Sequence, residues 1–228
     1  MKRQVIWVAA ILIVGVMPLM GITPKGEVAM AAGSPMESVL TVSNDTLFAL
    51  IGEPEYRLRQ AAMYVDENKT EAAVAALHTV RAFVQLERSR ATEPALDKLV
   101  DAIIALDTLA RNLGKPSPDM LQLSEVAYLT HLALAAHYQQ LAQTAWTNEI
   151  WQTTGQHLHA ADLHTRQGLA WGEHVLTDKQ QALLGENKIL AEALMDGPGC
   201  GNSWAADAAA PQIGAMGQLI DVLMPVAK

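Results

Sequence analysis

Four of the chain's seven histidines lie within eighteen residues, in the stretch HLHAADLHTRQGLAWGEH from His157 to His174. Imidazole nitrogens are common ligands of zinc, copper and iron, so this stretch raises the question of a metal or haem site. The ligands of one ion must converge within a few ångströms. The first test is therefore which histidines share a helix face.

The four histidines divide into two pairs on a helix. At about 100° per residue, His159 and His174 fall on the polar side, where His159 and Asp162 are expected to make a surface contact. His157 and His164 flank the apolar side but lie about 10 Å apart along the helix axis, which is too far for one ion. A site therefore needs a histidine from another helix.

The preceding helix supplies such a histidine, because His131 points away from that helix's polar face. That polar face is predicted to hold Gln122, Glu125, His137, Gln140 and Gln143. If the chain turns at Thr147 and Asn148, antiparallel pairing joins residues whose numbers add to about 295, as those of His131 and His164 do. These two residues, with His157 as a further ligand, form the predicted metal or haem site.

A structural role for the same histidines is the alternative. A buried His131 would then bond to Tyr128, a threonine or a backbone carbonyl, and the second histidine would lie at the rim. The chain has no C-x-x-C-H or E-x-x-H motif, and we expect no carboxylate to orient either ring. Trp146, Trp151 and Trp171 are predicted to gather near the turn, where they line a pocket or plug the bundle end.

Composition predicts an all-α fold. Hydrophobic residues make up 50% of the 228 residues and aromatic residues only 5%, so the apolar mass is mostly Ala, Leu, Val and Met, which favour helices. We predict an antiparallel bundle of about five to seven helices, because turns at uneven intervals do not fit a tetratricopeptide-type solenoid. The helices are expected near residues 54–68, 70–90, 94–114, 118–146, 148–176 and 178–195, with a terminal helix over 211–224. The expected capping side chains are Thr70, Ser117, Thr147 or Asn148, and Thr177.

Residues 1–32 are predicted to be a signal peptide. Two basic residues precede the apolar run 5–22, and Ala29 and Ala31 form an A-x-A cleavage pattern. The alternative is an uncleaved anchor, which would be the chain's one contact with a membrane. Residues 33–44 are expected to be a linker and residues 45–228 a single bundle domain. The protein is therefore predicted to be periplasmic or secreted.

Charge and cysteine content limit the partners. The formal net charge is −8, and it becomes −10 if cleavage removes Lys2, Arg3, Lys25 and Glu27. Nucleic acids and anionic membranes need a basic surface, so neither is an expected partner. Cys200 is the only cysteine, which leaves an intermolecular disulfide, and hence a linked dimer, or a tolerated free thiol.

These observations predict a non-catalytic binding or envelope-accessory protein whose partner is a protein or small molecule. No G-x-S-x-G motif is present, and the acidic residues lie singly on polar faces. The main alternative is a metal- or haem-binding bundle that uses His131 and His164. An enzyme with a site built across helices is a third hypothesis, and the sequence leaves the cofactor unknown.

Overall fold

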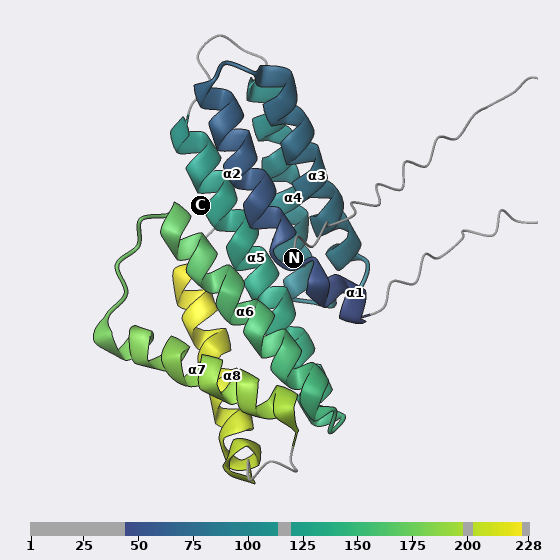
Figure 1. Ribbon diagram of the computed structural model, residues 1–228, viewed down its shortest axis with the longest axis vertical. Helices are drawn as coiled ribbons and strands as arrows, with labels where there is room; N and C mark the ends of the chain where they lie inside the picture. Colours follow the sequence, from purple (N-terminus) through teal and green to yellow (C-terminus); the bar gives the residue numbers. More distant parts are fainter. Residues whose placement is uncertain (1–43, 114–119, 198–202, 225–228) are drawn as a thin grey trace, which may run out of the picture. The chain divides into compact units, whose positions relative to one another are not determined.

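A computed structural model describes residues 44–113, 120–197 and 203–224, in which every regular element is a helix (Figure 1). The helices are α1 (Asn44–Ala49), α2 (Glu53–Asp66), α3 (Thr70–Arg88), α4 (Ala95–Leu113), α5 (Met120–Thr147), α6 (Trp151–Trp171), α7 (Asp178–Asp196) and α8 (Ser203–Leu223). Apart from the six-residue α1, each has at least 14 residues. The predicted all-α bundle is confirmed.

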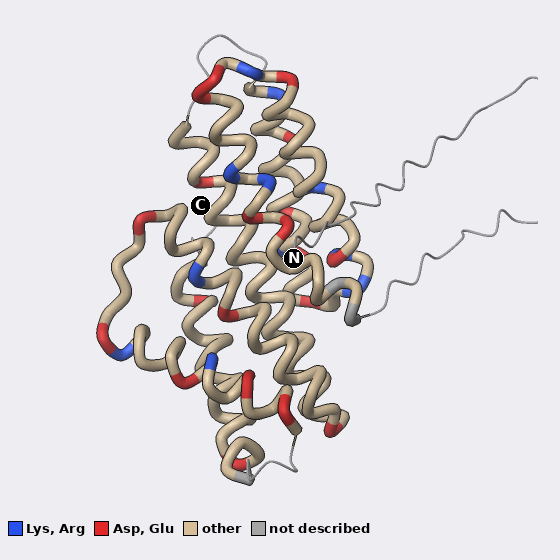
Figure 2. The backbone as a smooth tube through the Cα atoms, viewed as in Figure 1, with Lys and Arg blue, Asp and Glu red and all other residues tan. Residues whose placement is uncertain are grey.

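Helix α5 is the centre of the bundle. Helices α2, α3 and α4 pack on one another in chain order, and α4 packs on α5 (Figure 1). Helix α6 runs back along α5, α8 also packs on α5, and α7 crosses α6 and contacts α8. Covered by several neighbours, α5 buries 15 of its 28 residues. It is almost free of Lys, Arg, Asp and Glu (Figure 2).

Leucine and alanine make up most of the apolar core. All of the largest fully buried side chains are leucines, and each contributes about 1.5–3 kcal/mol by leaving water. One cluster joins α2, α3, α4 and α5, and two further clusters join α5 and α6 to α7 and α8. Alanines between the leucines let the helix axes approach closely.

The predicted helix boundaries agree with the structure to within a few residues, but the predicted caps agree less well. Thr177 caps α7 in a capping box with Gln180, as expected. Thr70 lies inside α3 and Lys69 occupies the cap position without a side-chain bond, so the predicted Thr70 cap is wrong. Helix α6 begins after Ile150 rather than with a cap from Thr147 or Asn148.

Helix α8 is longer than the terminal helix predicted over 211–224. It begins at Ser203 and continues through Pro211. The alanine-rich segment before the proline has high helix propensity, and the proline is exposed to solvent. The bundle thus tolerates one missing backbone hydrogen bond at its surface.

Several sequence predictions fall on residues outside the described ranges. These are the signal peptide or anchor (1–32), most of the linker (33–44), the cap at Ser117 and the thiol of Cys200. Residue 44 is described and begins α1. The described residues all belong to one unit, Val42–Lys228. Within the described ranges, no helix combines the length and the apolar character needed to cross a membrane.

Helices α6 and α7 meet at backbone distance at Gly155. A Cβ atom at this residue would lie 2.6 Å from the backbone oxygen of Ala191 and 2.8 Å from the backbone nitrogen of Met195. Such distances are too short for any side chain. The close crossing of α7 on α6 therefore requires glycine at this position.

Replacing Gly155 by alanine should weaken this crossing. We expect Gly155→Ala to lower the free energy of unfolding by about 1–3 kcal/mol, as overpacking does in a closely packed core. Gly185→Ala is the matched control, because a Cβ at Gly185 meets no atom within 4 Å. In α7 it should raise stability by about 0.5–1 kcal/mol through helix propensity. Urea denaturation followed by circular dichroism measures both, and an equal gain in both variants would contradict the close crossing.

Candidate functional site

His131 and His164 meet across the α5–α6 pair. The turn after α5 lies at residues 148–150, so the two helices run antiparallel as predicted. The two Nδ1 atoms are 3.1 Å apart, and both rings are fully buried. Opposite them, a Cβ at Gly168 would lie 3.3 Å from the Cβ of His131, so α6 approaches α5 closely here. The predicted encounter of these histidines is confirmed.

A carboxylate from α2 orients the pair. Glu55 Oε2 lies 3.0 Å from His131 Nε2 and accepts a 2.7 Å hydrogen bond from Trp171 Nε1. Arg59 pairs with the other carboxylate oxygen. The expectation that no carboxylate orients either ring is therefore wrong. Glu55 lies 76 positions before His131, and only the packing of α2 against α5 brings the two together.

Burial keeps both imidazoles neutral. Burial lowers the pKa of His131, against the opposing effect of Glu55, and lowers the pKa of His164 well below its usual value. Burial alone would raise the pKa of Glu55, but hydrogen bonds from His131 and Trp171 lower it to about 2. The site at neutral pH thus combines an ionised carboxylate with two uncharged rings.

These charge states assign the tautomers. An ionised carboxylate only accepts hydrogen bonds, so His131 carries its proton on Nε2 and donates it to Glu55. Nδ1 of His131 is then an acceptor, and His164 must donate from its own Nδ1. Nε2 of His164 remains as a buried acceptor without a donor among the described residues.

A second buried polar cluster lies on the side of α5 that faces α3. Glu87 accepts a hydrogen bond from Tyr138 at 3.1 Å and lies 3.0 Å from Nε2 of His137. Glu87 is 0% and His137 1% exposed, so the prediction that His137 faces solvent is wrong. Helix α3 covers a face of α5 that looks polar in the sequence. Arg90 lies 3.9 Å from Glu87, at the outer edge of the cluster.

Tyr138 lies next to both His164 and His157. Its ring is 5.6 Å from that of His164 and 6.0 Å from that of His157. Burial lowers the pKa of His157 to about 4 and raises that of Tyr138. His157 therefore lies beside Tyr138 and outside the His131–His164 contact. Its predicted role as a metal ligand stays a prediction.

The remaining polar residues of α6 differ from expectation. Asp162 is 6% exposed and binds Arg166 at 2.7 Å, so its predicted surface contact with His159 is wrong. It lies about two turns after Gly155, on the same side of α6. His159 is half-buried, and its ring lies 5.8 Å from that of Phe48.

The tryptophans separate into two places. Trp146 and Trp151 pack edge to face at the α5–α6 turn, with ring centroids 5.2 Å apart. Trp171 ends α6, at the opposite end of that helix, and the prediction that all three gather near the turn is wrong. Its bond to Glu55 instead links it to the histidine pair.

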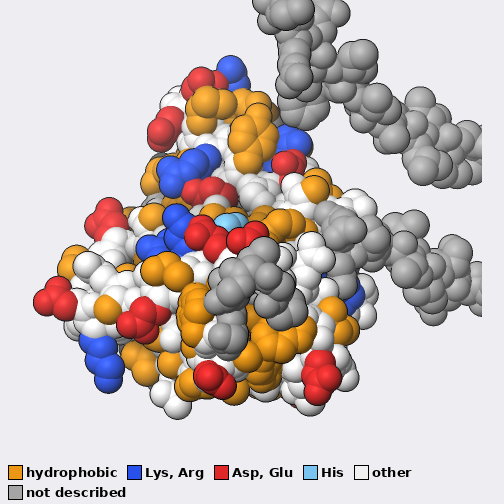
Figure 3. Space-filling model, turned by 60° about the horizontal axis from the view of Figure 1, so that its bottom comes forward, with side chains coloured by type: hydrophobic (Ala, Val, Ile, Leu, Met, Phe, Trp, Pro, Cys, Tyr) orange, Lys and Arg blue, Asp and Glu red, His pale blue; other side chains and the backbone are white. Residues whose placement is uncertain are grey.

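Within the described residues, no group of three or more His, Cys, Asp or Glu side chains is placed to hold one metal ion. The His131–His164 pair supplies two nitrogens, and Glu55 bonds to the far side of one ring. On the face shown in Figure 3, histidine contributes only a small area of surface. A ligand approaching from solvent meets other side chains first.

The surface has hollows of different sizes. A groove of about 540 Å³ lies between α7 and α8, where Leu183, Leu219 and Val222 line it. A cleft of about 390 Å³ lies where the end of α6 meets α5, and we call it the Trp171 cleft. Its lining includes Glu125, Tyr128, Trp171, Gly172, Glu173 and His174.

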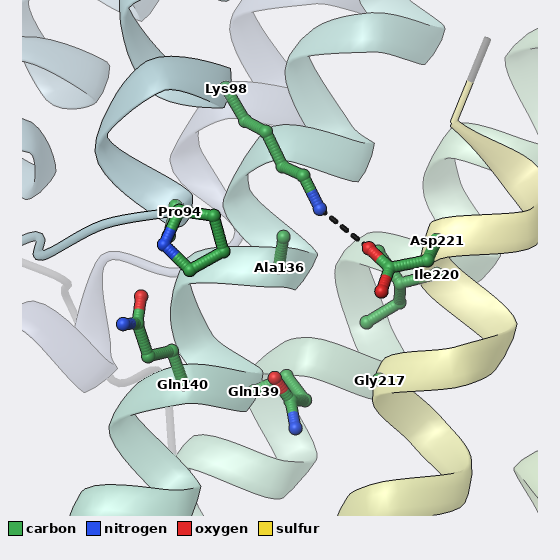
Figure 4. A pocket seen from close by; sticks show the side chains of 9 residues that line it. Pro94, Lys98, Ala136, Gln139, Gln140, Gly217, Ile220 and Asp221 are labelled. Carbon is green, nitrogen blue, oxygen red and sulfur yellow. Dashed lines mark hydrogen bonds and ion pairs between the residues drawn. The ribbon is translucent and has the colours of Figure 1, made fainter. Parts of the chain in front are cut away.

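A third hollow lies between α4, α5 and α8. Its volume is about 90 Å³, and Lys98 and Asp221 form a 2.7 Å ion pair beside it (Figure 4). Gln139 of α5 reaches the opposite helix and bonds to the backbone of Ile213. This hollow is too small for a ligand of ordinary size.

The fold and the site together define an all-α bundle whose core buries three histidines that contact one another or a glutamate. Comparisons with protein-family models, with curated proteins and with solved structures found no match to the chain. The function is therefore inferred from the geometry of the site.

The buried histidines should make stability depend on pH. For His157 the folded pKa is about 4, below the ordinary value of 6.5, so the unfolded chain binds protons more readily between these values. The stabilisation is complete above pH 6.5 and is lost as pH falls toward 4, at about 1.4 kcal/mol per pH unit for one group. His131 and His164 add losses of the same sign.

Urea denaturation at several pH values measures this slope. His157→Gln removes one titrating ring and should reduce the slope between pH 6.5 and about 4. His78→Gln alters an exposed histidine of α3 and serves as the control. An unchanged slope in His157→Gln would contradict the lowered pKa.

Proposed function

We propose that the protein is an exported, non-catalytic helical-bundle binding or envelope-accessory protein, which holds its ligand at a surface hollow. The observation that carries this proposal is the sealing of the histidine network. His131 and His164 are 0% exposed and His137 is 1% exposed. A general acid or base must come within hydrogen-bonding reach of its substrate. The buried histidines instead contact one another or a glutamate of the protein.

The open hollows support binding in the same way. Ligand sites of small molecules are concave and mostly apolar, with volumes of about 300–1,000 Å³. The groove between α7 and α8 and the Trp171 cleft both lie in this range. In neither hollow do the described lining residues hold a nucleophile in contact with a base. Recognition by shape and charge is the chemistry that they offer.

Export rests on the first residues of the chain. Lys2 and Arg3, the apolar run 5–22 and the small residues at Ala29 and Ala31 support a cleaved signal. An acidic protein without a basic stripe also suits small-molecule or protein partners better than polyanions.

The full-length chain expressed in a Gram-negative bacterial host tests this proposal. We expect the protein in the periplasmic fraction, with an intact mass that corresponds to loss of the predicted signal. Native mass spectrometry of that fraction should show added mass from a retained small molecule or a bound protein. Recovery in the cytoplasm with an uncut N-terminus would contradict export, and a ligand-free spectrum would contradict binding.

Metal binding at His131 and His164 is the second candidate function. Two nitrogens that bind one tetrahedral ion at ordinary bond lengths lie about 3.4 Å apart, close to the 3.1 Å between the two Nδ1 atoms. Glu55 accepts the proton on the far side of His131, as carboxylates do behind metal-bound histidines.

Gln167 offers the matching group behind His164. When an ion takes Nδ1 of His164, the ring proton moves to Nε2 and needs an acceptor. Burial lowers the pKa of His164, and Gln167 opposes this by raising it. The buried Oε1 of Gln167 has no donor among the described residues. The close packing of α5 on α6 supports an ion rather than a haem. The protein would supply two nitrogens, and other ligands would complete the coordination.

Titration of the untagged protein with cobalt(II) and copper(II) tests this candidate. One equivalent should bind with visible absorption, and His131→Phe or His164→Phe should abolish the signal. His157→Gln shows whether His157 is a third ligand, and His78→Gln is the exposed control. Binding that survives both phenylalanine variants, or no binding at all, would contradict a site at this pair.

A further inference from the structure

Three aromatic rings border the Trp171 cleft. Tyr128 and His174 are stacked, with ring centroids 4.9 Å apart. Gly172 lies directly against them, because a Cβ there would be 2.7 Å from a ring carbon of each. Any larger residue would push the turn after α6 away from α5. Glycine at this position therefore allows the rings and the turn to meet.

Trp171 is held in place and already accepts a cation. Its indole N–H donates to Glu55, which fixes the orientation of the ring. The Arg59 guanidinium lies 5.5 Å from the ring centroid and also pairs with Glu55. The charge of Arg59 is therefore balanced from within the protein. Arg59 is not part of the cleft lining.

The charge of the cleft is negative. Its lining includes the exposed carboxylates of Glu125 and Glu173 and contains no Lys or Arg among the described residues. Neither carboxylate forms an ion pair with a described residue. Glu173 also has a φ of 52°, a left-handed conformation that is unusual for glutamate. The turn holds Glu173 in the lining of the cleft at a conformational cost.

We propose that the Trp171 cleft binds a small organic cation, namely an ammonium group with alkyl substituents. This inference rests on the proposed function and names its ligand class. Aromatic faces attract such a cation and accommodate its apolar substituents, while the two carboxylates balance its charge. A volume of about 390 Å³ suits a molecule of this size. A metal ion would have no use for the faces of Tyr128 and Trp171.

Choline chloride is the probe for this inference. Calorimetric titration of the mature protein should detect its binding, with sodium chloride as the blank. The neutral isostere 3,3-dimethyl-1-butanol has the same shape without the charge and should bind about tenfold more weakly. Equal binding of choline and the isostere, or no binding of choline, would overturn the proposal.

Variants separate the rings from the carboxylates. Glu125→Gln combined with Glu173→Gln should weaken choline binding about fivefold, whereas Glu192→Gln, an exposed carboxylate of α7, should leave it unchanged. Trp171→Phe keeps an aromatic face without the bond to Glu55 and should bind within about threefold of the wild type. Trp171→Leu removes the face and should lose about tenfold. Equal loss in the two Trp171 variants would assign Trp171 a structural role and overturn its place in the site.

Two further experiments show whether the cation is free or belongs to a lipid headgroup, and they separate this inference from the proposed function. The protein should not sediment with phosphatidylcholine vesicles. If it sediments with the vesicles but does not bind free choline, a site for a free cation would be overturned. A retained ligand that is not a cation would overturn this inference and leave the proposed function intact. Choline binding by a protein recovered in the cytoplasm would support the cleft and contradict export.

Discussion

The structure depends on one constraint, which is that a polar group taken out of water must find a partner. Glu87, His131 and His164 are fully buried, and each would destabilise the bundle if it were left alone. Glu55 accepts bonds from His131 and Trp171, and Glu87 accepts one from Tyr138 beside His137. The four helices that supply these residues must therefore pack in one register.

This constraint explains why an alanine- and leucine-rich chain adopts one arrangement. Apolar helices of similar width can slide or rotate against one another at little cost, because their contacts are interchangeable. Moving α6 by one turn would separate His164 from His131, and moving α2 would separate Glu55 from His131 and Trp171. The network thus selects one packing among many that bury similar apolar area. Such specificity is a known use of buried polar groups.

The sequence predicts those features that depend on one helix or on two adjacent helices. Periodicity and turn residues locate the long helices, and the turn after α5 sets the pairing that joins His131 to His164. Helix ends are less predictable, because Thr70 and Ile150 show that a tertiary turn can replace a side-chain cap. The failed predictions about Glu55 and His137 concern contacts with helices that lie far away in the sequence.

The two carboxylates illustrate why these contacts escape prediction. Glu55 and Glu87 sit in amphipathic helices where single acidic residues usually face solvent, and nothing nearby in the sequence marks them as partners of buried histidines. The sequence pattern of α5 places His137 on a polar face, because the pattern of one helix does not show that α3 packs over that face. The sequence does carry one useful signal, since α5 has only one Asp, Glu, Lys or Arg in 28 residues. A helix so poor in charge is expected to be surrounded.

Nitrogen-15 spectroscopy of the two central rings tests the account most directly. Multiple-bond spectra of the metal-free protein at neutral pH distinguish the tautomers and the charge state of His131 and His164. Two neutral rings are expected, with the proton of His131 on Nε2, facing Glu55, and the proton of His164 on Nδ1, facing His131. Two doubly protonated rings, or two rings that both lack a proton on Nδ1, would contradict the buried network that holds the bundle in register.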